Sequence, residues 1–381
     1  MAKLNRVAVV GVGYSQVGRS LGLSQENLAA QASVAAMADA GLEPRDIDGM
    51  VLFSHLPQYL SATQVADAIG IPDLAFYSGT IDGAAYSVAA MHAIAAVASG
   101  SCHTCLTIRP ILMASGQGWT TDMVDRGAAG VRQFLAPYGV FTGSHWAGLY
   151  MRRIMDTYGT TAEHLGAFAI AQREYAAKNP DAVLRSPMTM DDYLNSRYII
   201  KPLRLFDCDY PVDSGSALIF TTEERARDMV KKPVFFDSWA MGTTTVNDFH
   251  LVEDMTHTSP HMAAKRMWGR TSLTPADVDV AGLYDGFTFI ALQWLEALGF
   301  CGDGESGPFV AEGNTRPTGS IPTNTDGGAC NVGRRHGANF FIEVTRQLRG
   351  ECGDRQIPGA QVGVVSNAVG AFASCALLTA D

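Results

Sequence analysis

Two stretches of this chain, 231 positions apart, have nearly the same sequence. Residues 42–48 read L-E-P-R-D-I-D, and residues 273–279 read L-T-P-A-D-V-D. Each stretch leads into a short apolar run, at 50–53 in the first copy and at 281–284 in the second. A repeated turn that enters a strand predicts one α/β unit used twice, and two copies this far apart exclude a solenoid. The alternative is chance, because Pro-Asp turns before strands are common.

Composition narrows the class of protein. Of the 381 residues, 47% are hydrophobic and 17% are charged, which predicts a large core. A net charge of −10 without a basic run argues against nucleic acid and anionic membranes as partners. We see neither a signal peptide nor an apolar run of about 20 residues, so we expect no membrane span.

The cysteine pattern favours the cytoplasm. Seven scattered cysteines indicate a reducing compartment. Cys102 and Cys105 form a C-x-x-C, but they lie in a segment typical of a buried strand. Because no second cysteine pair is nearby in the sequence, we expect structural cysteines and no metal site.

Strand and helix patterns alternate over much of the chain. We predict strands at 7–13, 50–54, 102–108, 216–220, 234–239, 362–365 and 374–378, and helices at 24–40, 61–69, 83–98 and 287–298. The helix at 83–98 is apolar all round, which indicates a buried helix. The alternation predicts a layered α/β fold with a largely parallel sheet, and strand 102–108 is our candidate for a free edge. Residues 110–205 break the alternation and predict an inserted loop domain.

Five segments resemble the thiolase superfamily, in the order in which that family carries them. Residues 158–165 and 207–217 resemble the segments that open a loop-domain helix and lead back to the core in sterol-carrier-type thiolases. Residues 284–287, Y-D-G-F, stand where that group carries H-D-C-F. Residues 324–328 and 333–338 stand where thiolases carry G-G and then G-H-P-x-G-A.

The resemblance implies a fold of two duplicated α/β/α halves. The first half would span 1–235, with a loop domain inserted at about 110–205, and the second would span 236–381. It also implies at least a homodimer, in which edge strands of the first half pair across a two-fold axis.

The departures from the thiolase pattern remove its covalent chemistry. The nucleophilic cysteine of C-x-x-G falls on Thr80, with Gly83 as the glycine. Tyr284 replaces the histidine of H-D-C-F, and Arg334 replaces the histidine of G-H-P. Residues 366–370, S-N-A-V-G, stand where the last catalytic cysteine is expected. A thiolase needs a cysteine thiolate, so Claisen condensation through a thioester is not expected.

The chain more closely resembles thiolase-like aldolases that cleave steroid side chains held as coenzyme A thioesters. These proteins also carry Y-D-G-F, lack the nucleophilic cysteine, and work with a small OB-fold, zinc-ribbon partner protein. The resemblance implies a carbon–carbon lyase that cleaves a 3-hydroxyacyl-CoA by a retro-aldol reaction, with the CoA thioester as substrate and no covalently bound cofactor. The alternatives are a thiolase-like acyltransferase and a non-catalytic scaffold in an acyl-CoA-processing complex.

The candidate catalytic residues are Tyr284, His336 and Arg334. A retro-aldol cleavage needs a base, an acid and oxyanion donors. We expect Tyr284 to be the base, provided that Arg334 or His336 favours its phenolate. His336 can serve as acid or base, and Arg334 could instead bind a CoA phosphate.

Five further residues are candidates for substrate binding. Backbone N–H groups near Gly83, at the start of the buried helix, would form an oxyanion site beside Thr80. Asn367 and Gly370 belong to a second candidate oxyanion loop, with ordinary turn chemistry as the alternative. His145, in the inserted region, is the fifth.

Overall fold

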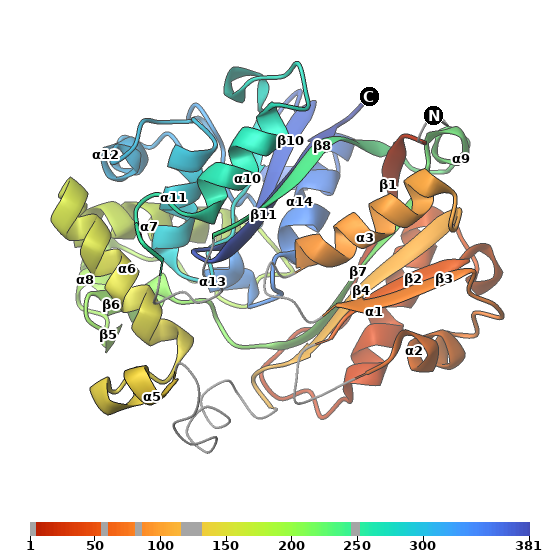
Figure 1. Cartoon of the computed structure of the whole chain (residues 1–381), viewed down its shortest axis with the longest axis horizontal. Helices are drawn as coiled ribbons and strands as arrows, with labels where there is room; N and C mark the ends of the chain where they lie inside the picture. Colours follow the sequence, from red (N-terminus) through yellow and green to blue (C-terminus); the bar gives the residue numbers. More distant parts are fainter. Residues whose placement is uncertain (1–4, 55–59, 81–85, 116–131, 245–251) are drawn as a thin grey trace.

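The computed structural model describes residues 5–54, 60–80, 86–115, 132–244 and 252–381. Nine of its described strands form one sheet, in the order β3-β2-β4-β7-β1-β8-β11-β10-β9. The strands are β1 (Val7–Tyr14), β2 (Gly49–Phe53), β3 (Phe76–Thr80), β4 (Thr104–Leu112), β7 (Asp213–Thr222), β8 (Val234–Thr243), β9 (Val280–Gly282), β10 (Val362–Val369) and β11 (Phe372–Thr379). Figure 1 shows this sheet running through the molecule with helices on its faces.

The sheet consists of two equivalent halves. The order β2-β4-β7-β1 of the first half matches β9-β10-β11-β8 of the second, with one parallel pair followed by two antiparallel pairs in each. A short antiparallel contact joins β1 to β8 through Ala8 with Phe235 and Val9 with Val234. The predicted duplication is confirmed. The predicted largely parallel sheet is wrong, since five of the eight pairings among its described strands are antiparallel.

The repeated stretches adopt the same local structure. Each begins with a 3-10 turn, Pro44–Asp46 in the first and Pro275–Asp277 in the second. In both copies the carboxylate of the third turn residue, Asp46 or Asp277, accepts the backbone N–H three residues before it at 2.8 Å. Proline fixes φ for the turn and the aspartate closes it, so the sequence pattern accounts for the geometry.

The last aspartate of each repeat holds the neighbouring strand. Asp48 accepts the backbone N–H groups of residues 103 and 104, where β4 begins. Asp279 accepts those of residues 361 and 362, where β10 begins. The same side chain therefore sets the register of the parallel pair in both halves.

Helices cover both faces of the first half. The described α-helices are α1 (Gln25–Ala40), α2 (Ala62–Ile69), α3 (Tyr86–Ser99), α5 (Arg132–Leu135), α6 (Gly143–Tyr158), α7 (Ala162–Ala177), α8 (Met190–Leu194), α9 (Glu223–Arg227), α10 (Ser259–Trp268), α11 (Thr288–Ala297), α12 (Ser306–Ala311), α13 (Ala329–Val332) and α14 (Ala338–Arg349). Ser24 caps α1 and Gly41 ends it, as predicted. Alternate residues of β1 pack to opposite faces, with Ala8 and Val10 toward α1, and Val7 and Val9 toward α3.

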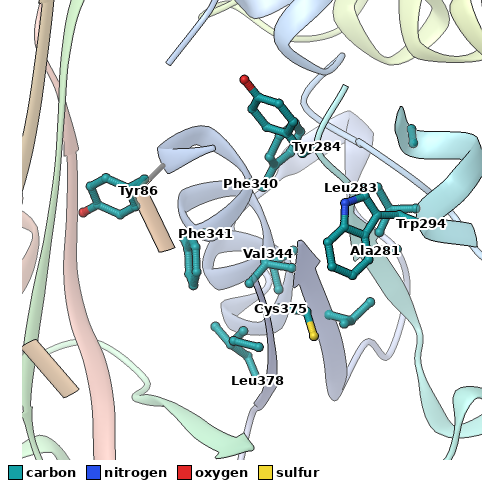
Figure 2. Packing of buried hydrophobic residues seen from close by; sticks show 14 of the residues in the cluster. Tyr86, Ala281, Leu283, Tyr284, Trp294, Phe340, Phe341, Val344, Cys375 and Leu378 are labelled. Carbon is teal, nitrogen blue, oxygen red and sulfur yellow. The ribbon is translucent and has the colours of Figure 1, made fainter. Parts of the chain in front are cut away.

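Two buried helices, α3 and α14, lie where the halves meet. The rings of Tyr86 on α3 and Phe341 on α14 are 5.9 Å apart. Figure 2 shows this contact, with Phe340, one position before Phe341 on α14, turned toward Tyr284. The packing of α14 therefore links the core to the strand end that follows β9.

The inserted region leaves and re-enters the sheet between neighbouring strands. Leu112 at the end of β4 pairs with Asp213 at the start of β7, although 100 residues separate them. The region holds α5 to α8 and a two-stranded ribbon, β5 (Tyr198–Ile200) and β6 (Leu203–Arg204). In Figure 1 it lies at the left, beside α11 and α12. The exact domain limits stay predictions, and the predicted boundary at 235 falls within β8.

The predicted free edge is wrong. Strand β4 lies between β2 and β7: residues 104–112 pair with β7, and residues 105–108 also pair with β2. The edge of the first half is β3, where Tyr77 is 63% exposed. At the other end a bridge from Thr323 to Ala281 covers β9. No helix in the described part of the chain combines the length and apolarity that a bilayer crossing needs.

Candidate active site

Tyr284 lies just beyond the end of β9 and is 8% exposed. Its backbone N–H donates to Ser366 Oγ at 3.2 Å, and its ring meets Phe340 edge-on. Burial raises the pKa of the Tyr284 phenol to about 12, while the positive charges of Arg334 and Arg109 act in the opposite direction. The phenol is therefore protonated at neutral pH, and the two arginines are the groups that favour its phenolate.

Gly286 makes room for the Tyr284 ring. A Cβ atom at position 286 would lie 2.8 Å from a ring carbon of Tyr284 and 2.9 Å from its hydroxyl oxygen. The tyrosine at 284 and the glycine at 286 are therefore a coupled pair. This explains why both letters of the H-D-C-F pattern differ together in this chain.

Arg334 connects the other candidate groups. Its Nε–H donates to His336 Nε2 at 2.9 Å, and the same nitrogen lies 3.1 Å from Asp209 Oδ2 in an ion pair. The charge of Arg334 also acts on the Tyr284 phenol. Burial lowers the pKa of Arg334, but the charges of Asp209 and Tyr284 outweigh it and hold that pKa above its usual value. Burial raises the pKa of Asp209 to about 6, with Arg334 opposing.

His336 lies between two arginines. Its Nε2 faces Arg334, and its Nδ1 faces Arg109 Nε at 3.1 Å. A neutral imidazole accepts at one nitrogen only, and a protonated one accepts at neither. The two guanidinium groups therefore favour the neutral ring. Its φ of +51° lets the backbone turn at this point, and Asn367 Nδ2 donates to the His336 carbonyl at 3.1 Å.

The sequence did not single out Arg109. It lies on β4, is 1% exposed, and donates to the carbonyls of Phe53 and Pro110 as well as to His336. Burial, followed by the charge of Arg334, lowers its pKa to about 9. An arginine within an otherwise apolar strand was the available signal, because such a charge is rarely buried without a purpose.

Asp285 fixes the backbone around the site. Its carboxylate accepts the N–H of Ala329 at 2.8 Å and the side-chain N–H of Gln172 at 2.7 Å. Burial raises its pKa to about 7. Because Gln172 belongs to α7 and Ala329 begins α13, Asp285 ties the inserted region to the second half just behind Tyr284.

The predicted substrate-binding residues lie in different surroundings. Thr80 ends β3 opposite Phe53, whose ring contacts both His336 and Arg109. It lines a cavity of about 480 Å³ with Ser54 and Tyr77. Gly83 lies outside the described residues.

Three of these residues make structural hydrogen bonds. Asn367 positions the turn at His336, and its Oδ1 is buried without a partner. The Gly370 N–H, which we predicted as an oxyanion donor, already donates to Thr258 Oγ1 at 3.3 Å. His145 closes the start of its own helix by accepting the Thr142 N–H at 3.2 Å.

A second cavity of about 380 Å³ adjoins the site at Asp209. It lies between the inserted region and the segment that returns to β7. Its lining is mostly apolar and includes the basic side chains Arg19, Arg173 and Arg197. A basic lining in a chain of net charge −10 is suited to an anionic ligand.

Two thiols line this cavity, those of Cys208 and Cys330. Burial raises the pKa of both, and the Asp285 charge raises that of Cys330 further. Because only the thiolate is nucleophilic, neither cysteine substitutes for the missing thiolase nucleophile.

Comparisons with known proteins identify the family of this chain. A family model described as Thiolase C-terminal domain-like matches residues 242–379. The chain is 35% identical to the steroid side-chain-cleaving aldolase of Thermomonospora curvata over 90% of both proteins. It is 36% identical to the 17-hydroxy-3-oxo-4-pregnene-20-carboxyl-CoA lyase of Mycobacterium tuberculosis, over 91% of this chain and 92% of that protein.

The solved structure of the Ltp2-ChsH2(DUF35) aldolase matches with a TM-score of 0.93 at 34% identity, covering 100% of this chain and 99% of the other. The predicted family and fold are confirmed. The chain belongs to the thiolase superfamily, in the group that contains the steroid side-chain-cleaving aldolases.

Proposed function

We propose that this protein is a carbon–carbon lyase that cleaves a 3-hydroxyacyl-CoA with a steroid-derived side chain into a ketone and a shorter acyl-CoA. The observation that carries the proposal is the buried group of Tyr284, Arg334 and His336 where thiolases have their catalytic residues. The similarity to two lyases over 90% or more of the chain supports it.

The first step needs a base at the substrate hydroxyl. We assign Tyr284 this role, with its phenolate formed beside Arg334. Removal of the hydroxyl proton makes the ketone carbonyl, the bond between carbons 2 and 3 breaks, and its electron pair moves into the thioester enolate. The guanidinium of Arg334 stabilises the negative charge that develops in this step, as preorganised cations do in other active sites.

The second step needs an acid at carbon 2 of the enolate. His336 in its neutral form carries one N–H, so only one of the two arginines can donate to the ring at a time. We assign the proton transfer to this ring or to the Tyr284 hydroxyl, which has by then gained a proton. Arg109 acts through His336 as a positioning residue, since it holds the ring from the opposite side to Arg334.

The basic cavity is suited to the coenzyme A part of the substrate. Its volume of about 380 Å³ lies in the range of small-molecule sites. Guanidinium groups bind phosphates by paired hydrogen bonds, so Arg19, Arg173 and Arg197 would meet the CoA phosphates. The apolar lining would cover the rest of that chain.

The raised pKa values of the two cavity thiols argue against the acyltransferase alternative. It needs a thiolate at the Thr80 position or beside it, and the cysteines at the cavity have raised pKa values. The scaffold alternative does not account for the four titratable side chains that are buried near one another, Arg109, Asp209, Arg334 and Asp285. Burying such groups costs free energy, and groups with shifted pKa values cluster at functional sites.

The proposal includes a partner protein, a homodimer and a cellular compartment. A second protein similar to the ChsH2(DUF35) component would bind this chain. We expect this partner to be the small OB-fold, zinc-ribbon protein that the family resemblance implies. A homodimer would form through the exposed edge of β3. The cytoplasm is the expected compartment.

The test is a ketone-release assay with a tertiary 3-hydroxyacyl-CoA, run on the purified chain alone and with its partner. The proposal predicts equal amounts of ketone and shorter acyl-CoA, with the partner raising the rate. Ketone formation that needs added free CoA would indicate thiolase chemistry instead, and no product under either condition would favour the scaffold.

A further inference from the structure

A second cluster of chemistry-bearing side chains lies apart from the residues assigned above. His257 directly precedes the cap of α10, His261 lies in the first turn of that helix, and Asp303 is in the loop between α11 and α12. One ligand atom from each residue lies within 4.8 Å of the others. We propose that these three side chains bind a divalent transition metal, with Zn²⁺ as the best fit.

The spacing between the groups is wrong for hydrogen bonds and suited to a shared ion. His261 Nε2 lies 3.7 Å from one oxygen of Asp303, and His257 Nδ1 lies 4.0 Å from the other. A hydrogen bond would need about 2.7–3.2 Å. Two ligands that each lie about 2.0–2.1 Å from a tetrahedral zinc ion are roughly 3.3 Å apart, so small side-chain rotations complete the site.

His261 supplies the independent observation. Its side chain is only 10% exposed, and both of its ring nitrogens are buried without a hydrogen-bond partner. A buried polar atom without a partner costs on the order of 1–3 kcal/mol, so such atoms are normally satisfied. The ring stacks on His257 with centroids 3.7 Å apart, and each of the two rings has one nitrogen within 4.0 Å of the Asp303 carboxylate.

The donor set selects the metal. Imidazole nitrogens suit Zn²⁺ and its first-row neighbours, whereas Mg²⁺ and Ca²⁺ prefer oxygen ligands alone. Two imidazoles and one carboxylate leave a tetrahedral position open to solvent, where His257 and Asp303 are 57% and 58% exposed.

The bound ion would stiffen the second half. It would join the start of α10 to the loop before α12, two segments that are 42 residues apart. Thr258, next to His257, accepts the Gly370 N–H, and the Ser259 N–H donates to the Gly370 carbonyl at 3.2 Å. The metal would therefore also hold the turn between β10 and β11.

The test uses the tag-free full chain, stripped with a chelator and titrated with Zn²⁺ by calorimetry, with metal content measured by mass spectrometry. We expect one zinc ion per chain and a higher melting temperature with zinc. His257→Ala and Asp303→Asn change exposed side chains, so folding should survive, and each should weaken zinc binding at least about tenfold.

The matched control is His103→Ala. His103 also pairs with a carboxylate, that of Asp48 at 2.9 Å, and is 65% exposed, but it belongs to the first half. Zinc binding should be unchanged in this variant. Failure of the wild-type chain to bind zinc, or one-to-one binding that both His257→Ala and Asp303→Asn leave unchanged, overturns the proposal.

Discussion

The two repeats have the same local backbone structure, but they lead to different side chains. In both, a Pro-Asp turn leads into a strand, and an aspartate holds the start of the next strand, Asp48 in the first half and Asp279 in the second. Within the described residues, the first repeat leads to Ser54 and the second leads to Tyr284 and Asp285. Duplication has thus kept the groups that set strand register, and in the part of the chain that the structure describes, the second strand end carries a group of titratable side chains.

The groups that Tyr284 meets come from both halves. Arg109 lies on β4 of the first half, and Arg334 and His336 lie in the second. A strand end that faces the junction between halves can collect charges from several elements, and the low polarity there strengthens their interaction. Position at this junction, rather than membership of a half, therefore decides where titratable side chains can act together.

The largest expected effect is that of Tyr284→Phe. The change removes one hydroxyl and keeps the ring on Phe340, so folding should survive. Turnover should fall by about 10²–10⁴, the usual worth of a positioned acid or base. Steady-state ketone release and a thermal melt check the two statements. A fall of less than about threefold would remove Tyr284 from the mechanism.

The rate should depend on pH if Tyr284 is the base. Its pKa of about 12 means that the phenolate fraction rises tenfold for each pH unit near neutrality. We expect kcat/KM to rise about a hundredfold from pH 7 to pH 9, and the rise should vanish in Tyr284→Phe. A flat profile in the wild-type enzyme would instead make the Tyr284 phenol the acid.

Gly286→Ala tests the pairing of the ring with its glycine. The added methyl would lie 2.8 Å from the Tyr284 ring, so the ring must move, and a shift of about 1 Å in a catalytic group can cost on the order of 10² in rate. The matched control is Gly79→Ala at the strand end of the first half, where the nearest atom is 3.8 Å away. Equal rates for both variants would contradict the proposed crowding.

Asp285→Asn should change how stability depends on pH. The folded pKa of about 7 lies above the usual value, so the folded state binds this proton more tightly, and stability is lost as pH rises from about 4 to about 7. Asparagine can accept from Ala329 and donate to the Gln172 Oε1, which has no partner now. The melting-temperature difference between pH 5 and pH 8 should therefore be smaller in the variant than in the wild type.

The sequence predicts the fold well because its signals are local. Ser24 and Gly41 bound α1 where the capping pattern places them, and the repeated turns have the same hydrogen bonds. Strand pairing is less local. The predictions of a free edge and of a largely parallel sheet were wrong because β7 returns beside β4 only after 100 residues. No nearby sequence signal encodes the antiparallel direction of that return.

The candidate site was predictable only in part. Tyr284, Arg334 and His336 stand in motifs, and the structure brings them together. Arg109 stands in no motif. Asp209 lies in the thiolase-like segment 207–217, but nothing in that segment marks it as a partner of Arg334, and both residues reach the site through tertiary packing. The roles of Thr80, Asn367, Gly370 and His145 in substrate binding stay predictions.

The central claim is that cleavage proceeds by proton transfer at Tyr284 without an acyl-enzyme. A single-turnover reaction of the chain with its partner, quenched early and followed by intact-protein mass spectrometry, tests it directly. We predict ketone release with no added mass on the protein, near-normal turnover in Thr80→Ala and loss of turnover in Tyr284→Phe. A covalent acyl adduct that forms in Tyr284→Phe and disappears in Thr80→Ala would contradict the account.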